Sequence, residues 1–298
     1  MRPRKPSPHL DNTTSLELYT TAANAAAAQI IGHYSTSFGL GTRLLGPAMR
    51  THIEAVYAMV RIADEIVDTY RAEGAREMLD AFEQEIGDAT ARGYSPNVVA
   101  HAFGMTARAV GITDAQTAPY FASMRMDLDT VTHDRASFET DVYGSAGVVG
   151  EMCLAVFLNT PTGPRPLPEH TAAGARALGD AYQKINFLRD IAMDDGQLGR
   201  SYFPGVTAKN LDDATLATLV ADCRSDIATA QQCLPALPRR ARIAVETTMD
   251  IYARLLSEIA ATPAAELAQR RVRVGNMTKF ALAARNSLPW LPSRRRPV

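Results

Sequence analysis

The sequence predicts an all-α protein, and three observations support this prediction. Long segments are rich in Ala, Leu, Met, Arg and Glu, which are good helix formers. Alternation of apolar and polar residues with period two, which is typical of strands, is scarce. Turn chemistry such as Gly46-Pro47 and residues 93–96 separates the segments. The expected helices cover residues 16–33, 34–45, 48–70, 75–90, 96–110, 115–130, 137–160, 168–195, 214–234, 239–261 and 263–286.

One large helical domain over residues 16–287 is the expected organisation. A basic, Pro-rich arm at 1–15 precedes it, which we expect to be disordered because it has no apolar core. A basic tail at 288–298 follows it. The Pro/Gly cluster at 160–166 is either a linker or a loop inside the domain. We favour the loop, because the two acidic motifs described below lie on either side of it and look matched.

Bulk composition excludes several classes of function. The formal net charge is -1, so no overall field indicates a nucleic-acid partner. The three cysteines, Cys153, Cys223 and Cys233, form no C-x-x-C pair and indicate reduced thiols in a cytoplasmic protein. No uninterrupted apolar run reaches the roughly 18 residues of a membrane span. The basic tail is either solvated or a peripheral contact with anionic lipid at the inner face of the cell membrane, where each basic residue adds about 1 kcal/mol.

An apolar helix over 48–70 carries one polar stripe. Tyr57, Arg61, Asp64 and Asp68 are spaced four, three and four residues apart, so they share a helix face. Carboxylates at i and i+4 lie about 5–6 Å apart at Cβ and repel each other. A hard divalent cation removes that repulsion, and Mg²⁺ is typically held by one or two carboxylates together with substrate phosphates. The spacing therefore predicts a Mg²⁺ site, with Mn²⁺ as the alternative ion.

A second apolar helix repeats this arrangement. Gln183, Asn186, Asp190 and Asp194 share one face of the segment 168–195. A single Asp pair at this spacing occurs by chance on many solvated helices. Two such pairs, each on an apolar helix and each beside an arginine, favour a common site for divalent cations and diphosphate.

Five motifs together resemble the squalene/phytoene synthase family. Residues 64–68 are similar to its Asp-[Asp/Glu]-x-x-Asp box, and 186–194 to its Asn-x-x-Arg-Asp-x-x-x-Asp box. Residues 199–204 resemble its Gly-Arg-x-Tyr-x-Pro motif, and 143–150 its Tyr-x-x-Ala-Gly-x-x-Gly helix. The segment 34–38 stands where the family has His-Ser-Lys-Ser-Phe. The resemblance extends from about residue 30 to 285, and its details are most similar to actinobacterial phytoene synthases.

The resemblance implies a single-domain isoprenoid (terpenoid) synthase fold with a central cavity. It implies the head-to-head condensation of two geranylgeranyl diphosphates to phytoene through prephytoene diphosphate, in carotenoid biosynthesis, without a nicotinamide. The implied metal ligands are Asp64, Asp68, Asn186, Asp190 and Asp194, with Arg61 and Tyr57 in the catalytic group. The implied substrate-binding residues are Ser35, Ser37, Phe38, Tyr143, Gln183, Asn186, Arg189, Arg200, Tyr202, Tyr252 and Arg271.

Several residues leave alternatives open. Tyr34 and Thr36 replace the family's His and Lys, which weakens the expected diphosphate contact there. Lys184 either projects outward or supplies the missing charge. Arg189 either binds phosphate or pairs with Asp190, and Phe38 and Tyr143 are either cavity walls or ordinary core. The glycines at 144, 147 and 150 make room for a prenyl chain or for close packing. His33, His52, His101 and His133 show no ligand spacing and receive no role.

Two other functions compete with phytoene synthesis. A squalene- or dehydrosqualene-type synthase would use farnesyl diphosphate and would differ in the depth of its cavity. A non-catalytic assembly protein of the same fold should have lost metal ligands, whereas all four aspartates are present. The sequence leaves open the substrate chain length, the double-bond geometry of the product and the oligomeric state.

Overall fold

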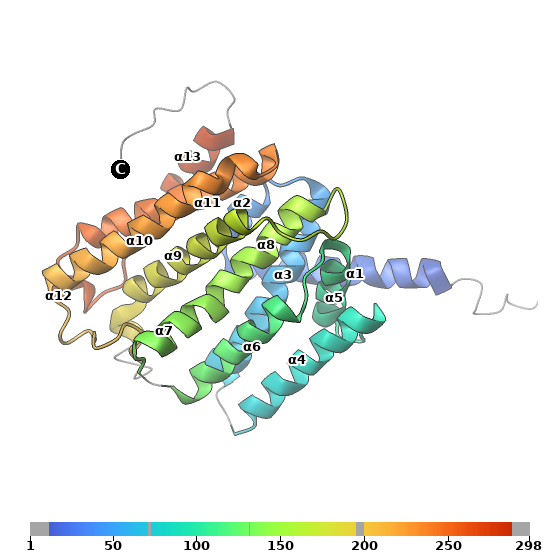
Figure 1. Cartoon of the computed structure of the whole chain (residues 1–298), viewed down its shortest axis with the longest axis horizontal. Coiled ribbons are helices and arrows are strands. Elements are labelled where there is room, and N and C mark those ends of the chain that lie inside the picture. The colour runs from blue at the N-terminus through green and yellow to red at the C-terminus, as the bar shows by residue number, and fades with distance from the viewer. Residues whose placement is uncertain (1–11, 71–72, 131, 195–199, 288–298) are drawn as a thin grey trace, which may run out of the picture.

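The protein folds as a bundle of helices, shown in Figure 1. A computed structural model describes residues 12–70, 73–130, 132–194 and 200–287. These residues contain no strand, only an isolated bridge between Thr132 and Ser201. The all-α prediction is therefore confirmed. The α-helices are α1 (Asn12–Tyr34), α2 (Thr36–Thr42), α3 (Pro47–Glu65), α4 (Ala75–Arg92), α5 (Val98–Val110), α6 (Asp114–Asp129), α7 (Arg135–Val142), α8 (Val148–Asn159), α9 (Glu169–Met193), α10 (Asp213–Cys233), α11 (Arg239–Ala260), α12 (Ala264–Leu267) and α13 (Asn276–Ser287).

Two long helices contain a π-helical turn that the sequence did not predict. In the segment expected as one helix over 48–70, α3 passes into a π-turn at Ile66–Tyr70, which carries Asp68. In the segment expected over 137–160, a π-turn at Tyr143–Gly147 joins α7 to α8. Single π-turns inside α-helices are frequent at functional sites because they redirect the side chains that follow.

The first and last of the expected helices differ from those in the structure. Helix α1 begins at Asn12, so its first turn includes residues assigned to the disordered arm; residues 1–11 lie outside the described part of the chain. The single helix expected over 263–286 is wrong, because α12 ends at Leu267 and residues 271–275 are not helical before α13 begins. Alternating burial in the segment 271–275, with Val272 5% exposed, anchors it to the core. The basic tail at 288–298 also lies outside the described residues.

Glycines bring the central helices α8 and α9 unusually close together. A Cβ atom on Gly150 would lie 2.2 Å from the carbonyl oxygen of Ala175, and one on Gly179 would lie 2.2 Å from that of Ala146. A Cβ on Gly144 would lie 2.6 Å from the carbonyl oxygen of Pro119 on α6. Of the two explanations for this glycine pattern, close packing therefore holds for residues 144 and 150, although Gly150 also lines the cavity described below.

One helix is long and apolar enough to pass a test for a membrane span. It covers residues 135–159, and 61% of its most apolar window is buried inside the protein. It also carries Glu151, which is 6% exposed and whose carboxylate lies 2.7 Å from Arg176 Nη1 on α9. Burial together with a buried ion pair is typical of a core helix in a bundle. The Pro/Gly cluster that follows is held by Asn159, whose Nδ2 donates to the carbonyl oxygens of Val110 and Arg165 at 2.8 and 2.9 Å.

Candidate active site

A cavity of about 300 Å³ lies between the central helices. Its walls come mainly from α2, α3, α8, α9 and α11, and most of them are apolar, such as Val149, Leu178 and Val245. Tyr57 of α3 and Gln183 and Asn186 of α9 line the cavity toward the ends of these helices that carry the aspartates, and we call this part of the lining its polar end. The lining residues are Ile31, Phe38, Gly41, Thr42, Leu45, Ile53, Val56, Tyr57, Val60, Ser145, Ala146, Val149, Gly150, Cys153, Leu154, Phe157, Thr171, Gly174, Ala175, Leu178, Gly179, Tyr182, Gln183, Asn186, Ala230, Cys233, Leu234, Leu237, Ala244, Val245 and Thr248.

The first acidic motif continues along α3 beyond the polar end of the cavity. The Arg61 guanidinium donates from Nη1 to Asp64 Oδ2 at 2.6 Å and also pairs with Glu65. The same guanidinium lies over the Tyr34 ring, 4.3 Å from its centroid, which adds a cation–π contact. Arg61 is therefore held in place by its neighbours, with Asp64 beside it on the face that the sequence predicted.

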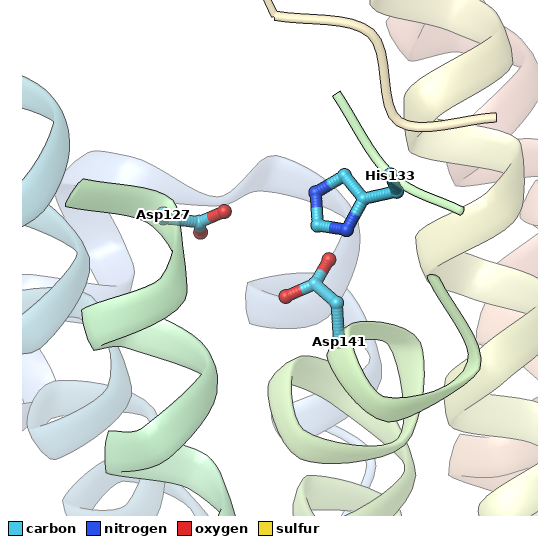
Figure 2. A group of neighbouring side chains, drawn as sticks. All are labelled: Asp127, His133 and Asp141. Carbon is cyan, nitrogen blue, oxygen red and sulfur yellow. The ribbon is translucent and has the colours of Figure 1, made fainter. Parts of the chain in front are cut away.

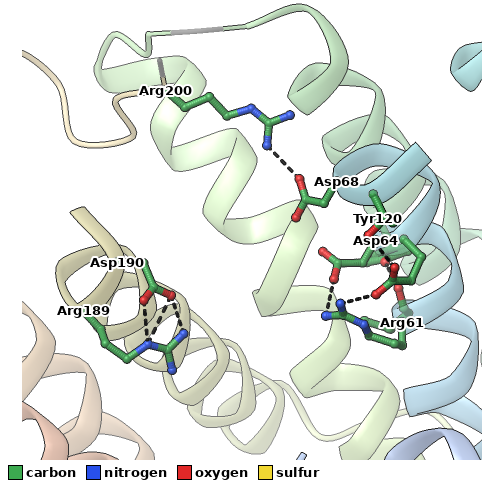
Figure 3. A network of polar contacts seen from close by, with 10 residues as sticks. Arg61, Asp64, Asp68, Tyr120, Arg189, Asp190 and Arg200 are labelled. Carbon is green, nitrogen blue, oxygen red and sulfur yellow. Dashed lines mark hydrogen bonds and ion pairs between the residues drawn. The ribbon is translucent and has the colours of Figure 1, made fainter. Parts of the chain in front are cut away.

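Asp68 meets a residue that is distant in sequence. In Figure 3, Arg200 lies across from the π-turn that carries Asp68. Arg200 Nη1 donates to Asp68 Oδ1 at 2.9 Å, and its Nη2 donates to the main-chain oxygen of Asp127 at 2.6 Å. Arg200 is only 8% exposed, and the two hydrogen bonds from Nη1 and Nη2 fix the position of its guanidinium. The motif at 199–204 is thereby joined to the first aspartate pair, although residues 195–199 themselves lie outside the described part of the chain.

The second acidic motif lies on α9. Asp190 accepts hydrogen bonds from Arg189, whose Nε lies 3.1 Å from both carboxylate oxygens, and Arg271 Nε lies 2.6 Å from Asp190 Oδ1. Arg189 therefore pairs with Asp190, one of the two alternatives that the sequence left open. Arg271 reaches the same carboxylate from the segment 271–275 after α12. Asp194 is the C-cap residue of α9.

The electrostatics show that the two aspartate pairs are close to each other. Burial and the nearby Asp68 raise the pKa of Asp64 to about 6. Burial, Asp190 and again Asp68 raise the pKa of Asp194 to about 7. Asp68 of the first motif thus acts on a carboxyl group of the second. Figure 3 shows the same relation, with Asp190 across from Asp64 and Asp68.

This donor set fits divalent cations. Crowded, partly buried carboxylates disfavour their own ionised forms, and a cation bound between them removes that cost. The buried Oδ1 atom of Asn186, at the edge of the cavity, has no hydrogen-bond partner within the described residues. An amide oxygen is a suitable ligand for a hard cation. Asp64, Asp68, Asp190 and Asp194 together with Asn186 therefore remain the predicted set of metal ligands.

Aromatic rings form the wall of the cavity near its polar end. Phe38 lies 6.4 Å from Tyr57, 5.9 Å from Tyr182 and 5.8 Å from Tyr252, measured between ring centroids. Tyr252 is 5% exposed and stacks on Tyr182 at 3.9 Å. Phe38, Tyr57 and Tyr182 line the cavity, whereas Tyr252 supports the wall from behind.

The remaining predicted substrate-binding residues have mixed surroundings. Ser35 caps α2, where its Oγ accepts from Phe38 N at 3.0 Å, and Ser37 in the first turn of the same helix is half-buried. Tyr202 stacks on Phe187 at 3.8 Å beside Arg200. Tyr143 is 36% exposed in the second π-turn and is not among the residues that line the cavity.

Lysine 279 is a cationic residue that the sequence reasoning missed. Its Nζ donates to Thr36 Oγ1 at 3.0 Å, so α13 places an ammonium group where the family motif carries its own Lys. Partial burial and the nearby Arg189 lower the pKa of Lys279, which places the two cations in one electrostatic neighbourhood. Lys184, the residue considered as a replacement, instead contacts Asp222 and Asp226 of α10 at 2.6 and 2.8 Å. No sequence signal marks Lys279, because it lies 243 positions from its partner.

Comparisons with known proteins agree with this geometry. The profile of the squalene/phytoene synthase family matches residues 31–278. The phytoene synthase of Mycobacterium tuberculosis is 30% identical over 269 residues, which cover 83% of this chain and 85% of that protein. The 15-cis-phytoene synthase of Synechocystis is 32% identical, over 67% of this chain and 60% of that protein. The chain therefore belongs to the squalene/phytoene synthase family, as the sequence motifs predicted.

Solved structures share the fold. A dehydrosqualene synthase superposes with a TM-score of 0.79 at 22% identity, covering 91% of this chain and 97% of that one. A squalene synthase from Alicyclobacillus acidocaldarius gives a TM-score of 0.72 at 20% identity, covering 84% of this chain and 97% of that one. These similarities establish the all-α terpenoid synthase fold, and the chain is a prenyl synthase of the phytoene or squalene type.

Proposed function

We propose that this protein condenses two geranylgeranyl diphosphates head to head and forms phytoene. The observation that carries the proposal is an apolar cavity lined at its polar end by Tyr57 and Asn186, which lie on the two helices that also carry Asp64 and Asp190. Diphosphate groups suit the charged end, and prenyl chains suit the apolar interior. The phytoene synthases among the relatives favour this substrate over a shorter one.

The charged rim would bind and orient the leaving diphosphates. Asp64, Asp68, Asp190 and Asp194, with the Asn186 amide oxygen, would hold Mg²⁺, which neutralises diphosphate charge as a Lewis acid when it is bound. Cationic side chains at the same rim can donate charge-assisted hydrogen bonds to phosphate oxygens. Arg189 and Arg271 contact Asp190, and both guanidinium groups would be available to phosphate if that carboxylate held a cation. Arg200 keeps its buried contacts and positions Asp68.

The cavity wall would protect the allylic cation that remains after diphosphate leaves. Phe38 and Tyr57 present aromatic rings near the polar end, and ring faces attract cations. The apolar residues beyond them exclude water, which would otherwise convert the cation to an alcohol. The chain's own contribution is therefore to place the reacting carbons beside aromatic faces in a dry cavity.

The depth of the cavity supports a long prenyl chain. Its lining follows α9 from Asn186 back to Thr171, fifteen residues, which corresponds to about 22 Å along the helix axis. Ala175 lies part of the way down, about 16 Å from Asn186 along the same axis. A large side chain at Ala175 would shorten the space for substrate without touching the charged rim.

Lipid analysis tests the proposal directly. The protein is incubated with Mg²⁺ and either geranylgeranyl or farnesyl diphosphate, and the extracted lipids are identified by mass spectrometry. We expect phytoene from the longer substrate, no turnover in EDTA, and loss of activity in Asp190→Asn. We also expect Ala175→Phe to shift the preference toward farnesyl diphosphate. Product from farnesyl diphosphate alone would refute the substrate assignment.

The two alternative functions give distinct results in the same assay. The solved structures named as dehydrosqualene and squalene synthases favour a farnesyl-using enzyme as the second candidate, which would form a thirty-carbon product. A non-catalytic assembly protein would form no product from either substrate.

We further propose that the large hydrocarbon product is delivered to the inner face of the cell membrane by peripheral contact, which vesicle co-sedimentation can test.

A further inference from the structure

A group of three ionisable side chains lies beside Arg200 but outside the two aspartate motifs. Asp127 at the end of α6, His133 before α7 and Asp141 within α7 place one candidate ligand atom each within 4.8 Å of one another. In Figure 2 the His133 ring lies beside both carboxylates, with one ring nitrogen turned toward Asp141 and the other on the side of Asp127. His133 is 7% exposed and Asp141 is 1% exposed, so the group is largely withdrawn from solvent.

Two of the three side chains have unsatisfied buried atoms. Nδ1 of His133 and Oδ1 of Asp127 have no hydrogen-bond partner within the described residues. Asp141 is better satisfied, because its Oδ1 accepts from Ser123 Oγ at 2.5 Å. Buried polar atoms are nearly always paired, and leaving them unpaired is costly. A buried imidazole nitrogen without a partner, on a ring that lies beside two carboxyl groups, indicates a ligand that completes the group.

The charge of the group also calls for a cation. The candidate ligand atoms of two carboxyl groups and one imidazole lie within 4.8 Å of one another, and two of the three side chains are buried. Arg200 is near, but the hydrogen bonds that its guanidinium makes within the described residues go to Asp68, to Tyr202 and to the main-chain oxygen of Asp127. A dication would balance the charge of two carboxylates.

We propose that Asp127, His133 and Asp141 bind a divalent transition-metal cation of the Zn²⁺ class, at a site separate from the aspartate pairs. One imidazole and two carboxylates suit Zn²⁺ better than Mg²⁺, which prefers oxygen ligands alone. Ligands of a tetrahedral Zn²⁺ site lie about 3.3 Å apart, so small rotamer changes would close the present spacing. Water would complete the coordination. The cation would join α6 to α7 beside Arg200 and would therefore act through position and stability.

Metal binding to the full-length protein tests this proposal. The aspartate pairs are first silenced with Asp64→Asn and Asp190→Asn, and the protein is stripped with EDTA, dialysed and supplied with millimolar Mg²⁺. Zn²⁺ is titrated calorimetrically, and Co²⁺ is titrated by visible absorption as a spectroscopic substitute. We expect one equivalent to bind and the melting temperature to rise. His133→Gln should weaken binding at least tenfold.

A matched histidine provides the control. His52→Gln should leave Zn²⁺ binding unchanged, because His52 Nδ1 is satisfied by Thr106 Oγ1 at 2.9 Å and lies in a different part of the bundle. If circular dichroism shows that His133→Gln is unfolded, Asp141→Asn replaces it with the same expected loss. Absence of binding in the silenced background, or equal affinities with and without the His133 imidazole, would overturn the proposal. Because the readout is binding, this result is independent of whether the substrate assignment holds.

Discussion

Replacing Asp64 by asparagine should stabilise the metal-free protein at neutral pH. Burial and the neighbouring Asp68 raise the pKa of Asp64 from 3.8 to about 6. A shift of about two units corresponds to about 3 kcal/mol against the ionised form, since each unit is worth 1.36 kcal/mol. The Asp64 side chain is 34% exposed, so solvent screening reduces this to about 1–2 kcal/mol. The shift in the pKa of Asp64 is a net value that already includes the favourable interaction of its carboxylate with Arg61.

The sign of the pH dependence follows from linkage. A folded-state pKa above the unfolded value means that the folded protein binds the proton more tightly, so its stability contribution is complete below about pH 4 and is lost as pH rises through about 6. The wild-type protein therefore loses stability relative to Asp64→Asn between pH 4 and pH 7. Above pH 7 the variant should be more stable by about 1–2 kcal/mol, or roughly 2–6 °C in melting temperature.

Thermal melts in EDTA from pH 4 to pH 8 would measure this difference. Adding Mg²⁺ with inorganic pyrophosphate should reverse the order, because the wild-type protein keeps the carboxylate that binds the cation. Asp88→Asn is a suitable control, since Asp88 forms an exposed pair with Arg92 at 3.2 Å on the surface of α4. A difference between wild type and Asp64→Asn that stays constant from pH 4 to pH 8 would refute the reasoning.

Three further predictions follow from particular contacts. Arg200→Met should destabilise the protein by about 3 kcal/mol in urea melts, because a buried guanidinium that positions Asp68 is lost. The same substitution should lower kcat more than it raises KM, and an unchanged kcat would contradict this. Gly150→Ala should lower the free energy of unfolding by about 1–3 kcal/mol, because its Cβ would collide with α9. Gly87→Ala, in open space on α4, should raise it by about 0.5–1 kcal/mol. Equal effects of the two substitutions would exclude the packing argument. Lys279→Met should raise the KM for prenyl diphosphate about tenfold, the loss of one charge-assisted hydrogen bond, with no change in melting temperature; an unchanged KM would remove Lys279 from the site.

The local features of the site were predictable from the sequence. Helix formation depends on neighbouring residues, so composition and turn chemistry predicted α3 and α9. The spacing of Asp64 and Asp190 from their partner carboxylates follows from helix geometry alone. The sequence also predicted the family, because the five motifs keep their order along the chain, and the family profile confirms it.

The long-range features were not predictable in this way. The break between α12 and α13 was missed because Ala- and Arg-rich residues favour a helix locally. Burial of Val272 and the contact of Arg271 with Asp190 instead favour the non-helical segment seen in the structure. Lys184 and Lys279 could not be told apart as sources of positive charge until the helices were placed. His133 received no role from its spacing, and only the approach of α6 and α7 brings it between two carboxylates.

The sequence by itself therefore determined most of the helices, the two aspartate stripes and the membership of the family. The tertiary structure decided which residues meet across the bundle: Arg200 with Asp68 over 132 positions, Lys279 with Thr36 over 243, and the cavity between α3, α8 and α9. The physical reason is that spacing along one helix is fixed by backbone geometry. Contacts between helices depend instead on how closely and at what angle the helices pack. Here the close approach of α8 and α9 depends on glycines, because a Cβ atom at Gly150 or Gly179 would lie 2.2 Å from a carbonyl oxygen of the facing segment.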